Sequence, residues 1–307
     1  MTEAPALRIG TRGSALAVAQ TSAFASALRT AAGCDTRLVT VTTEGDRSAQ
    51  PLTGIGGEGV FATGLRHALL AGQCDVVVHS LKDLPTAPWP GLIVAAIPPR
   101  ADARDALCAR DGLALDALPA GARVGTGSPR RAAQLRARRP DVAPVPLRGN
   151  VDTRLAAVAR GDLDAVLLAA AGLGRLGRAD AITDLLALDR WPTAPGQGAL
   201  AVEVRAGEEP LVLALDDAPT RLAVTAERRV LALLEAGCTA PVGVHATTDG
   251  GVLHLAAAVY DADGRHVLWS VRDVPTTDVP DPADRAAQLV ARELLDAGAA
   301  DLMGVLR

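Results

Sequence analysis

The sequence is poor in aromatic residues, and it contains no long apolar run. Only six of the 307 residues are aromatic although 49% are hydrophobic, so the cores must be built mainly from Leu, Val and Ala, which favours layered α/β packing. No segment approaches the roughly 18 unbroken apolar residues of a membrane span. The N-terminus has no basic stretch followed by an apolar run, so we expect no membrane partner and a cytoplasmic location.

The cysteines form no pattern that indicates a disulfide framework or a metal site. Cys34, Cys74, Cys108 and Cys238 are scattered without a CxxC pair. The first three lie beside apolar runs and are interpreted as structural. Cys238 lies in a Gly-containing loop after a predicted helix, and from position alone it is either a spare buried thiol or a reactive one.

Positive charge is concentrated in one part of the chain. Residues 123–178 hold eleven arginines and four aspartates, a local charge of +7, whereas the whole chain carries −4 and the remainder therefore −11. A region of one sign attracts ligands of the opposite sign. The region lacks interleaved aromatic residues for base stacking, so small carboxylates or phosphates fit better than nucleic acid.

The first hundred residues predict an α/β unit. Continuous apolar strands that alternate with helices are typical of a parallel sheet covered on both faces. The expected strands are 7–10, 37–43, 75–80 and 92–98, and the expected helices are 15–33 and 61–72.

A second α/β unit follows the Pro98-Pro99 break. Ser128 suits the N-cap of its first helix and Pro129 the first helical position. The expected strands are 123–126, 143–147 and 164–170, and the expected helices are 128–139, 151–160 and a stretch through 177.

The last third of the chain has a different pattern. Residues 193–206 predict a loop and a strand that returns to the first sheet, so two α/β domains joined by two crossings would hinge around a cleft. The remaining elements predict an antiparallel sheet with helices: helices 225–237 and 282–303, and strands 244–248, 252–260 and 266–274. We therefore expect three domains: 1–98 with 194–216, 99–193, and 217–307.

Two arginines stand in the first turn of the helix that begins at Pro129. Cations are disfavoured there because the helix dipole is positive, so something anionic should offset Arg130 and Arg131. Backbone N–H groups and guanidinium groups could converge on one carboxylate or phosphate. The alternative is that both side chains reach into solvent.

Four further arginines follow predicted strands or lie in the next helices: Arg12, Arg148, Arg154 and Arg175. Ligands of parallel α/β sheets bind beyond the carboxyl ends of the strands. Several arginines at equivalent positions predict a ligand that carries several carboxylates.

Lys82, the only lysine of the chain, and Asp83 follow a buried-looking strand. The Asp83 carboxylate could stabilise a cationic intermediate or transfer a proton. The alternative is an ion pair with a neighbouring arginine.

A G-x-G-x-x-G match occurs at Gly54, Gly56 and Gly59. The preceding strand ends about ten residues earlier, so these glycines do not form the tight turn of a dinucleotide site. A mobile loop over the cleft is the preferred interpretation.

Taken together, the chain resembles the porphobilinogen deaminase family over essentially its whole length. The motifs that carry the resemblance are TRGSALAVAQ, TTEGD, HSLKDLP, RDA at 104–106, VGTGSPRRAAQL, LRGNVDTRL, AAGLGRLG, APGQGALAVE and LEAGCTAPVG. The resemblance implies two periplasmic-binding-protein-like α/β domains around a cleft and a C-terminal α+β domain with a small antiparallel sheet.

The resemblance also implies an activity. Cys238 would hold a dipyrromethane cofactor through a thioether. Asp83 would assist the loss of ammonia from porphobilinogen and stabilise the cationic azafulvene that results. Four condensations would give a linear tetrapyrrole that hydrolysis releases as hydroxymethylbilane, and the enzyme would be a monomeric transferase.

Further positions match the family's binding residues. Those implied to bind the cofactor are Ser80, Lys82, Thr126, Ser128, Arg130, Arg131, Arg154 and Gln197. Those implied to bind the substrate are Arg12, Ser14, Arg148 and Arg175. Gly54 and Glu58 stand where many relatives carry lysines, so the glycine-rich loop is not expected to bind carboxylates, and Glu44 stands where some members have a basic residue.

Two other classes of protein were considered. A non-catalytic two-lobed dicarboxylate-binding protein would use the arginines but gives Cys238 no role. A nicotinamide-dependent oxidoreductase rests only on the misplaced glycines.

Overall fold

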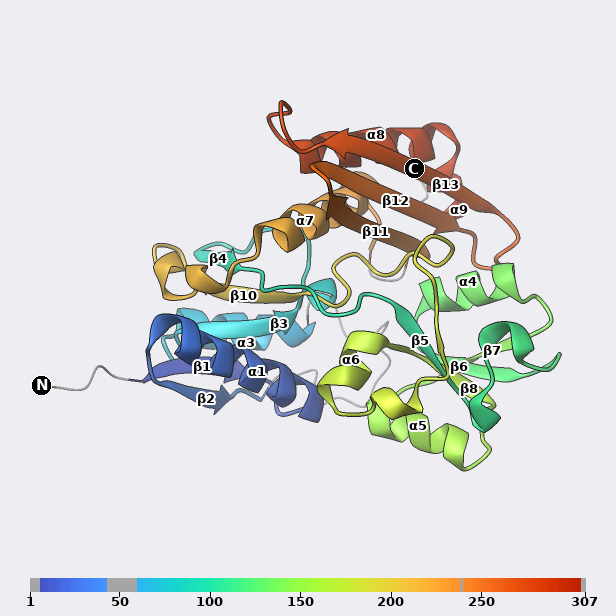
Figure 1. The fold of residues 1–307 in the computed structure, drawn as a ribbon, viewed down its shortest axis with the longest axis horizontal. Helices are drawn as coiled ribbons and strands as arrows, with labels where there is room; N and C mark the ends of the chain where they lie inside the picture. Colours follow the sequence, from blue (N-terminus) through green and yellow to red (C-terminus); the bar gives the residue numbers. More distant parts are fainter. Residues whose placement is uncertain (1–5, 43–59, 238–239, 305–307) are drawn as a thin grey trace, which may run out of the picture. The chain divides into compact units, whose positions relative to one another are not determined.

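The computed structural model describes residues 6–42, 60–237 and 240–304 (Figure 1). The chain forms two compact units: Met1–Ala101 with Ala199–Arg221, and Asp102–Gly198 with Leu222–Arg307. This division does not test a separate third domain, so the three-domain boundaries stay a prediction. Within the described ranges, no helix is both long and apolar enough to cross a membrane.

The first unit contains a five-stranded mixed sheet. Strand β1 pairs in parallel with β2 and β3, as the sequence predicts, but β10 enters between β3 and β4 and is antiparallel to both. The expectation of an all-parallel sheet is therefore wrong at this edge, because β10 returns from the second unit rather than through a crossover helix. The strands in spatial order are β2 (Thr36–Thr40), β1 (Leu7–Thr11), β3 (Val76–Ser80), β10 (Leu200–Arg205) and β4 (Leu92–Ala96).

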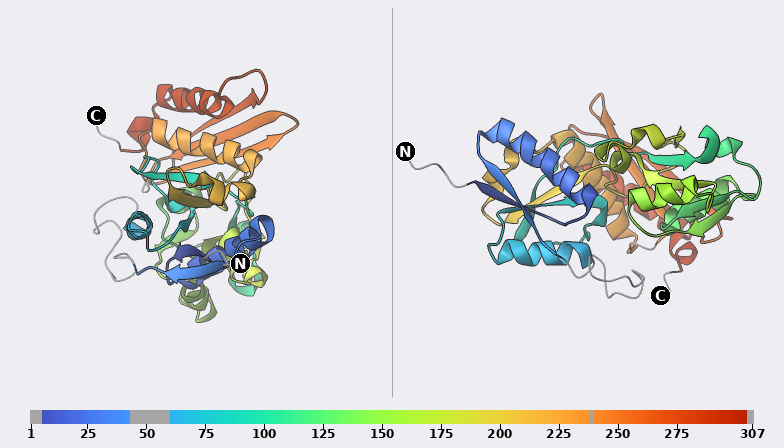
Figure 2. Two further views of the ribbon diagram at one scale, coloured as in Figure 1. Left: turned by 90° about the vertical axis from the view of Figure 1, so that its left-hand side faces the viewer. Right: turned by 90° about the horizontal axis from the view of Figure 1, so that it is seen from below.

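Two helices cover opposite faces of this sheet (Figure 2). They are α1 (Ala15–Ala32) and α3 (Val60–Leu70). Successive side chains of β3 point to opposite faces of the sheet. Val76 and Val78 pack with Leu28 of α1, whereas Val77 packs with Leu65 of α3. This alternation decides which side chains of β3 can reach each helix.

The second unit contains another five-stranded mixed sheet. Strand β6 pairs in parallel with β7 and β8, whereas β5 is antiparallel to β8 and β9. Strand β5 was not expected from the sequence. The strands in spatial order are β7 (Ala143–Pro146), β6 (Arg123–Thr126), β8 (Ala165–Ala169), β5 (Asp105–Ala109) and β9 (Asp184–Leu185), and the helices are α4 (Pro129–Arg138), α5 (Val151–Ala159) and α6 (Ala170–Arg175).

The start of α4 agrees with the sequence prediction. Ser128 is the N-cap, its hydroxyl accepts a hydrogen bond from the Arg131 backbone N–H, and Pro129 is the first helical residue. Both residues favour this start because the first N–H groups of a helix have no acceptor in a preceding turn: the serine hydroxyl accepts one of them, and proline has no N–H to satisfy.

A three-stranded antiparallel sheet with helices on one face completes the second unit, as predicted. The core combines Val230 of α7 and Val290 of α8 with Leu255 of the central strand. The expected single helix over 282–303 is wrong, because Gly298 adopts a φ of 96° and separates two helices. The elements are α7 (Ala218–Leu233), β11 (Val242–Asp249), β12 (Val252–Tyr260), β13 (Val267–Pro275), α8 (Pro282–Asp296) and α9 (Ala299–Leu302).

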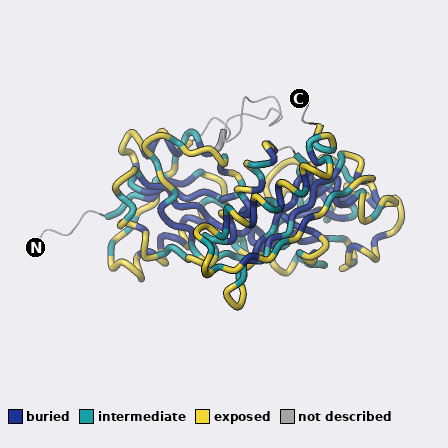
Figure 3. Tube along the Cα trace, turned by 90° about the horizontal axis from the view of Figure 1, so that it is seen from above, coloured by how far each residue is buried: buried dark blue, intermediate teal, exposed yellow. Residues whose placement is uncertain are grey.

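The segment that follows Trp191 is held by this C-terminal layer. The Val244 N–H donates to the Thr193 carbonyl at 2.7 Å. A Cβ on Gly243 would lie 2.5 Å from the Pro192 carbonyl oxygen, so only glycine allows this approach. Figure 3 shows that buried residues follow the strands and exposed residues gather at turns.

Candidate ligand-binding site

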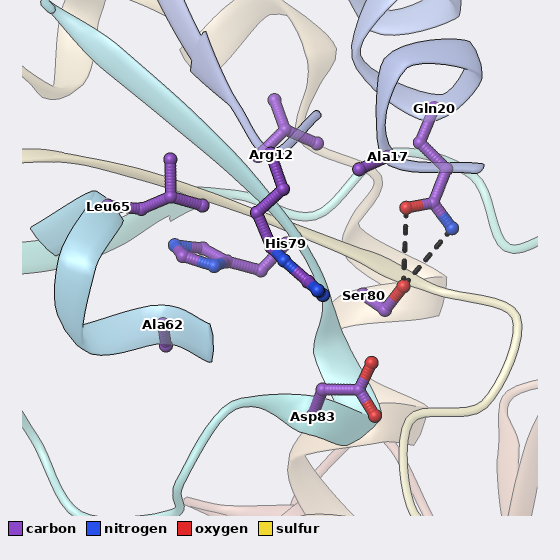
Figure 4. Close-up of a pocket in the computed structure, with 9 residues that line it drawn as sticks. Arg12, Ala17, Gln20, Ala62, Leu65, His79, Ser80 and Asp83 are labelled. Atoms are coloured by element: carbon purple, nitrogen blue, oxygen red, sulfur yellow. Dashed lines mark hydrogen bonds between the residues drawn. The ribbon is translucent and has the colours of Figure 1, made fainter. Parts of the chain in front are cut away.

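In the first unit, predicted site residues gather at the carboxyl ends of β1 and β3. Ser80 is the last residue of β3, Asp83 ends the short 3-10 turn Leu81–Asp83 that follows, and Arg12 follows β1. These two strands are parallel, so their carboxyl ends meet at one edge. Arg12, Ser80 and Asp83 line one pocket together, and Figure 4 shows the three side chains directed into the same space.

The polar side chains around this pocket differ in how firmly they are held. Ser80 Oγ exchanges hydrogen bonds with the buried Gln20 of α1, at 3.1 Å and 3.3 Å. Asp83 is exposed, and within the described residues it forms no ion pair, so the alternative of an ion pair with a neighbouring arginine finds no support in that part of the chain. Ser14 is exposed at the N-cap of α1, and Lys82 is half-buried.

A buried ion cluster that the sequence analysis missed lies beside the pocket. Glu203 of β10 accepts from Arg66 Nη2 at 2.7 Å and lies 3.0 Å from His79 Nε2. Burial alone would raise the pKa of Glu203, but hydrogen bonds from His79 and Arg66 outweigh it and hold the pKa at about 2. The Arg66 guanidinium also lies 5.0 Å from the centre of the Trp89 ring.

In the second unit, the loop from β6 to α4 brings predicted residues to the carboxyl end of β6. Thr126 is buried, and its hydroxyl accepts from the Ser128 N–H at 3.2 Å. A Cβ on Gly127 would lie 2.8 Å from the Leu147 carbonyl oxygen, so glycine permits the close approach of this loop to the segment after β7.

Asp105 of β5 is the anion that offsets the two arginines in the first turn of α4. Its Oδ1 accepts from Arg131 Nε at 3.0 Å and Nη2 at 2.6 Å, and from Gln197 Nε2 at 2.8 Å. Its Oδ2 accepts from Arg130 Nη1 and Trp191 Nε1, both at 2.8 Å. Asp105 is fully buried and the two arginines are 4% and 6% exposed, so the alternative of solvent-exposed arginines is wrong.

The protonation of this cluster is set by its charges. Burial alone would raise the pKa of Asp105, but the charges of Arg130 and Arg131 and their hydrogen bonds outweigh it and hold that pKa far below its usual range. Two guanidinium groups face one carboxylate, which leaves one positive charge in excess. Burial of charge in excess favours a further anion nearby.

Arg154 and Arg175 are half-buried and donate only to backbone carbonyls among the described residues. Arg154 Nε donates to Gly149 O at 2.8 Å, and Arg175 Nη2 donates to Gly198 O at 2.7 Å. Burial lowers the pKa of both, and for Arg154 the nearby charge of Arg131 lowers it further. Neither forms an ion pair with a described carboxylate.

The predicted residues thus form two groups, one in each unit. In the second unit, Arg130, Arg131 and Gln197 meet at Asp105, and Arg148 is exposed after β7. Cys238 lies outside the described residues, as do the glycine match over 54–59 and Glu44 and Glu58. The roles assigned to individual residues stay predictions.

Asp105 and Trp191 are the main contributors that the sequence analysis missed. The available signal was the motif RDA at 104–106, in which an acidic residue precedes an apolar run. An acid at the start of a buried strand requires a cationic partner, and the arginines in the first turn of α4 were among those that required an anion.

These features define an α/β protein of two mixed sheets with an exposed carboxylate in one unit and an excess of buried guanidinium charge in the other. The chain belongs to the porphobilinogen deaminase family. Residues 7–212 match the family described as porphobilinogen deaminase, dipyromethane cofactor binding domain, and residues 221–296 match the porphobilinogen deaminase C-terminal domain.

Relatives from bacteria match nearly the whole chain. The porphobilinogen deaminase of Leifsonia xyli is 60% identical over 97% of this chain and 94% of that protein. The porphobilinogen deaminase of Thermobifida fusca is 51% identical over 97% of this chain and 96% of that protein. Among solved structures, a periplasmic substrate-binding protein from Coxiella burnetii has a TM-score of 0.43 at 15% identity and covers 72% of this chain and 96% of that chain.

Proposed function

We propose that this chain is a hydroxymethylbilane synthase, a transferase of tetrapyrrole biosynthesis. Four porphobilinogen molecules each lose ammonia as a new carbon–carbon bond forms, and water releases the linear hydroxymethylbilane. The observation that carries this proposal is family membership over nearly the whole chain.

The residues of the second unit fit a cofactor that carries acetate and propionate groups. The buried Nε of Arg130 has no hydrogen-bond acceptor among the described residues, and no described carboxylate neutralises Arg154 or Arg175. Carboxylates of the ligand would satisfy all three.

We propose that the thioether forms with Cys238 and that Arg130, Arg131 and Arg154 bind the cofactor's carboxylates, with support from other polar groups. When bound, the dipyrromethane supplies a nucleophilic pyrrole carbon to which the next ring is joined. The supporting groups are Ser80, Lys82, Thr126, Ser128 and Gln197.

The exposed Asp83 carboxylate suits the positive charge that develops as porphobilinogen loses ammonia. Its charge is not neutralised by any described residue, so it is available to donate or accept a proton and to stabilise a cation. Arg12, Ser14, Arg148 and Arg175 would bind the carboxylates of the incoming substrate.

We further propose that the protein acts in the cytoplasm as a monomer and binds neither nucleic acid nor a membrane. Three described cysteines, Cys34, Cys74 and Cys108, are free thiols, which suits a reducing compartment. The arginine-rich region lacks the interleaved aromatic residues that stack on bases.

Intact mass under denaturing conditions tests the proposal. Protein from cells that supply porphobilinogen should carry the mass of two linked pyrrole rings and give a positive aldehyde colour reaction. Cys238→Ser should remove both signals, and the control Cys34→Ser should keep them. Wild-type protein without an adduct would instead favour the non-catalytic dicarboxylate-binding protein.

A further inference from the structure

We infer that Asp105 is a positioning residue: it holds the guanidinium groups of Arg130 and Arg131 in the orientation that binds ligand carboxylates, and it sets the charge left over for that binding. The inference rests on the proposed function, because the ligand carboxylates are those of the pyrrole rings. Asp105 itself is buried and would not touch the ligand.

The geometry around Asp105 leaves no freedom for its carboxylate. Five donor contacts converge on its two oxygens, from Arg130, Arg131, Trp191 and Gln197, all between 2.6 and 3.0 Å. These partners come from α4 and from the segment that follows Trp191. The carboxylate therefore joins the β5 strand to both flanking segments at one point.

Each arginine has a second anchor, so its guanidinium plane is fixed in direction. Arg131 Nη1 donates to the Leu167 carbonyl of β8 at 3.1 Å, and Arg130 Nη1 donates to Gln134 Oε1 at 2.6 Å. A guanidinium anchored by these bonds presents its remaining N–H groups in a set direction, and the buried Nε of Arg130, which has no acceptor among the described residues, is one of them.

An amide cannot replace this carboxylate. Asparagine offers one oxygen acceptor and one NH₂ donor, so the NH₂ would face donors of Arg130 and Trp191 on the Oδ2 side. The substitution would also raise the net charge of the cluster from +1 to +2. Repulsion between the two guanidinium groups would then turn them away from their present orientation.

The first unit offers a matched control in Asp75. This carboxylate also lies between two arginines, with Arg8 Nη2 at 2.5 Å and Arg205 Nη2 at 3.5 Å. It precedes β3, at the opposite end of that strand from Ser80, and no predicted site residue touches it. Asp75→Asn therefore disrupts a similar ion cluster without touching the proposed site.

The experiment compares Asp105→Asn with Asp75→Asn in the full chain. Intact mass measures how much protein carries the covalent adduct, and porphobilinogen consumption gives kcat and KM. A third readout uses Cys238→Ser protein, which cannot form the adduct, and measures the rise in Tm on addition of citrate, a tricarboxylate probe.

We expect Asp105→Asn to weaken carboxylate binding by roughly 30-fold or more, as when one partner of a buried, hydrogen-bonded charge pair is removed. The rise in Tm on addition of citrate should become smaller, and a smaller share of the protein should carry the adduct. KM should rise by a larger factor than kcat falls. Asp75→Asn should lower the Tm without changing these three readouts. The inference would be overturned if Asp105→Asn and Asp75→Asn gave the same result in these three readouts. It would also be overturned if citrate did not raise the Tm of the Cys238→Ser protein.

A second variant covers the case in which Asp105→Asn does not fold. Trp191→Phe keeps an aromatic ring at this position but removes the indole N–H that donates to Asp105 Oδ2, without changing the charge. Trp191→Phe should partly reduce the rise in Tm on addition of citrate. An unchanged rise would count against positioning by Asp105. Wild-type protein that carries no adduct, together with Cys238→Ser protein whose Tm rises with citrate, would refute the proposed function and leave the Asp105 comparison to decide the inference.

Discussion

The two units each bury a carboxylate–arginine cluster, and the clusters differ in how many guanidinium groups share the carboxylate. Glu203 pairs with one arginine, Arg66, and with His79, whereas Asp105 is shared by Arg130 and Arg131. The first cluster is neutral apart from any proton on the histidine, and it ties α3 to β3 and β10. The second retains positive charge at the carboxyl end of β6, where sheets of this kind bind ligands. A carboxylate–guanidinium cluster thus stabilises the first unit, and in the second unit it leaves a positive charge that an anion can neutralise.

The two units also differ in the charge of the side chains that have no oppositely charged partner among the described residues. In the first unit this side chain is the exposed Asp83, whereas in the second unit the half-buried Arg154 and Arg175 donate only to backbone carbonyls. One unit therefore suits a positive reacting centre and the other an anionic chain. The predictions below test this division.

Replacement of Asp83 should have the largest effect. Asp83→Ala should lower the rate of porphobilinogen consumption by about 10²–10⁴-fold, the usual contribution of a positioned acid or base. The side chain is exposed and forms no described ion pair, so the Tm and the adduct mass should stay close to those of the wild type. Wild-type rates in this variant would contradict the role of Asp83.

Replacement of Glu203 should affect stability and its dependence on pH. Glu203→Gln leaves Arg66 buried without its carboxylate and should cost about 3 kcal/mol at neutral pH, as for other broken buried ion pairs. The folded-state pKa of Glu203 is about 2, below its ordinary value of 4.5, so its contribution is complete above pH 4.5 and is lost as the pH falls toward 2.

Urea unfolding of both proteins across this range measures the effect. The difference between wild type and Glu203→Gln should shrink by roughly two thirds between pH 6 and pH 3. A difference that stays constant over this range would show that the pKa of Glu203 is not lowered in the folded protein.

The smallest effects should come from the two N-cap serines. Ser14 caps α1 and Ser128 caps α4, each by accepting one backbone N–H at 3.3–3.4 Å. Ser14→Ala and Ser128→Ala should each lower the free energy of unfolding by about 1 kcal/mol. Urea denaturation compares them directly, and a much larger loss for Ser128→Ala would show that this cap also supports the arginine cluster.

Features with local signals could be predicted from the sequence. Ser128 and Pro129 mark the start of α4 because capping and proline geometry act within one turn. The short turns between the C-terminal strands, DGG at 249–251 and DADG at 261–264, predicted an antiparallel sheet for the same reason, since each turn acts within a few residues. The sequence also predicted that Arg12 and Arg148 follow strands, because each of them stands beside a glycine that marks a turn after a short strand.

Features that depend on distant partners could not be predicted. Asp105 lies 25 residues before Arg130, outside the arginine-rich region in which charges were counted, and its strand has only five residues. The break at Gly298 was missed because the hydrophobic pattern continues on both sides of it. The antiparallel direction of β10 depends on the path of the chain through the second unit, and no local sequence pattern indicates that path.

The position of β10 between β3 and β4 in the first sheet has a consequence for synthesis of the chain. Its Leu200 pairs with Ser80 of β3 and its Val202 with Ala96 of β4, so the two earlier strands lack their common neighbour until more than 100 further residues have been made. Contacts this far apart in sequence slow folding and leave unpaired strand edges in the meantime. On the ribosome, the part of the protein that is translated first is therefore among the last to complete its fold.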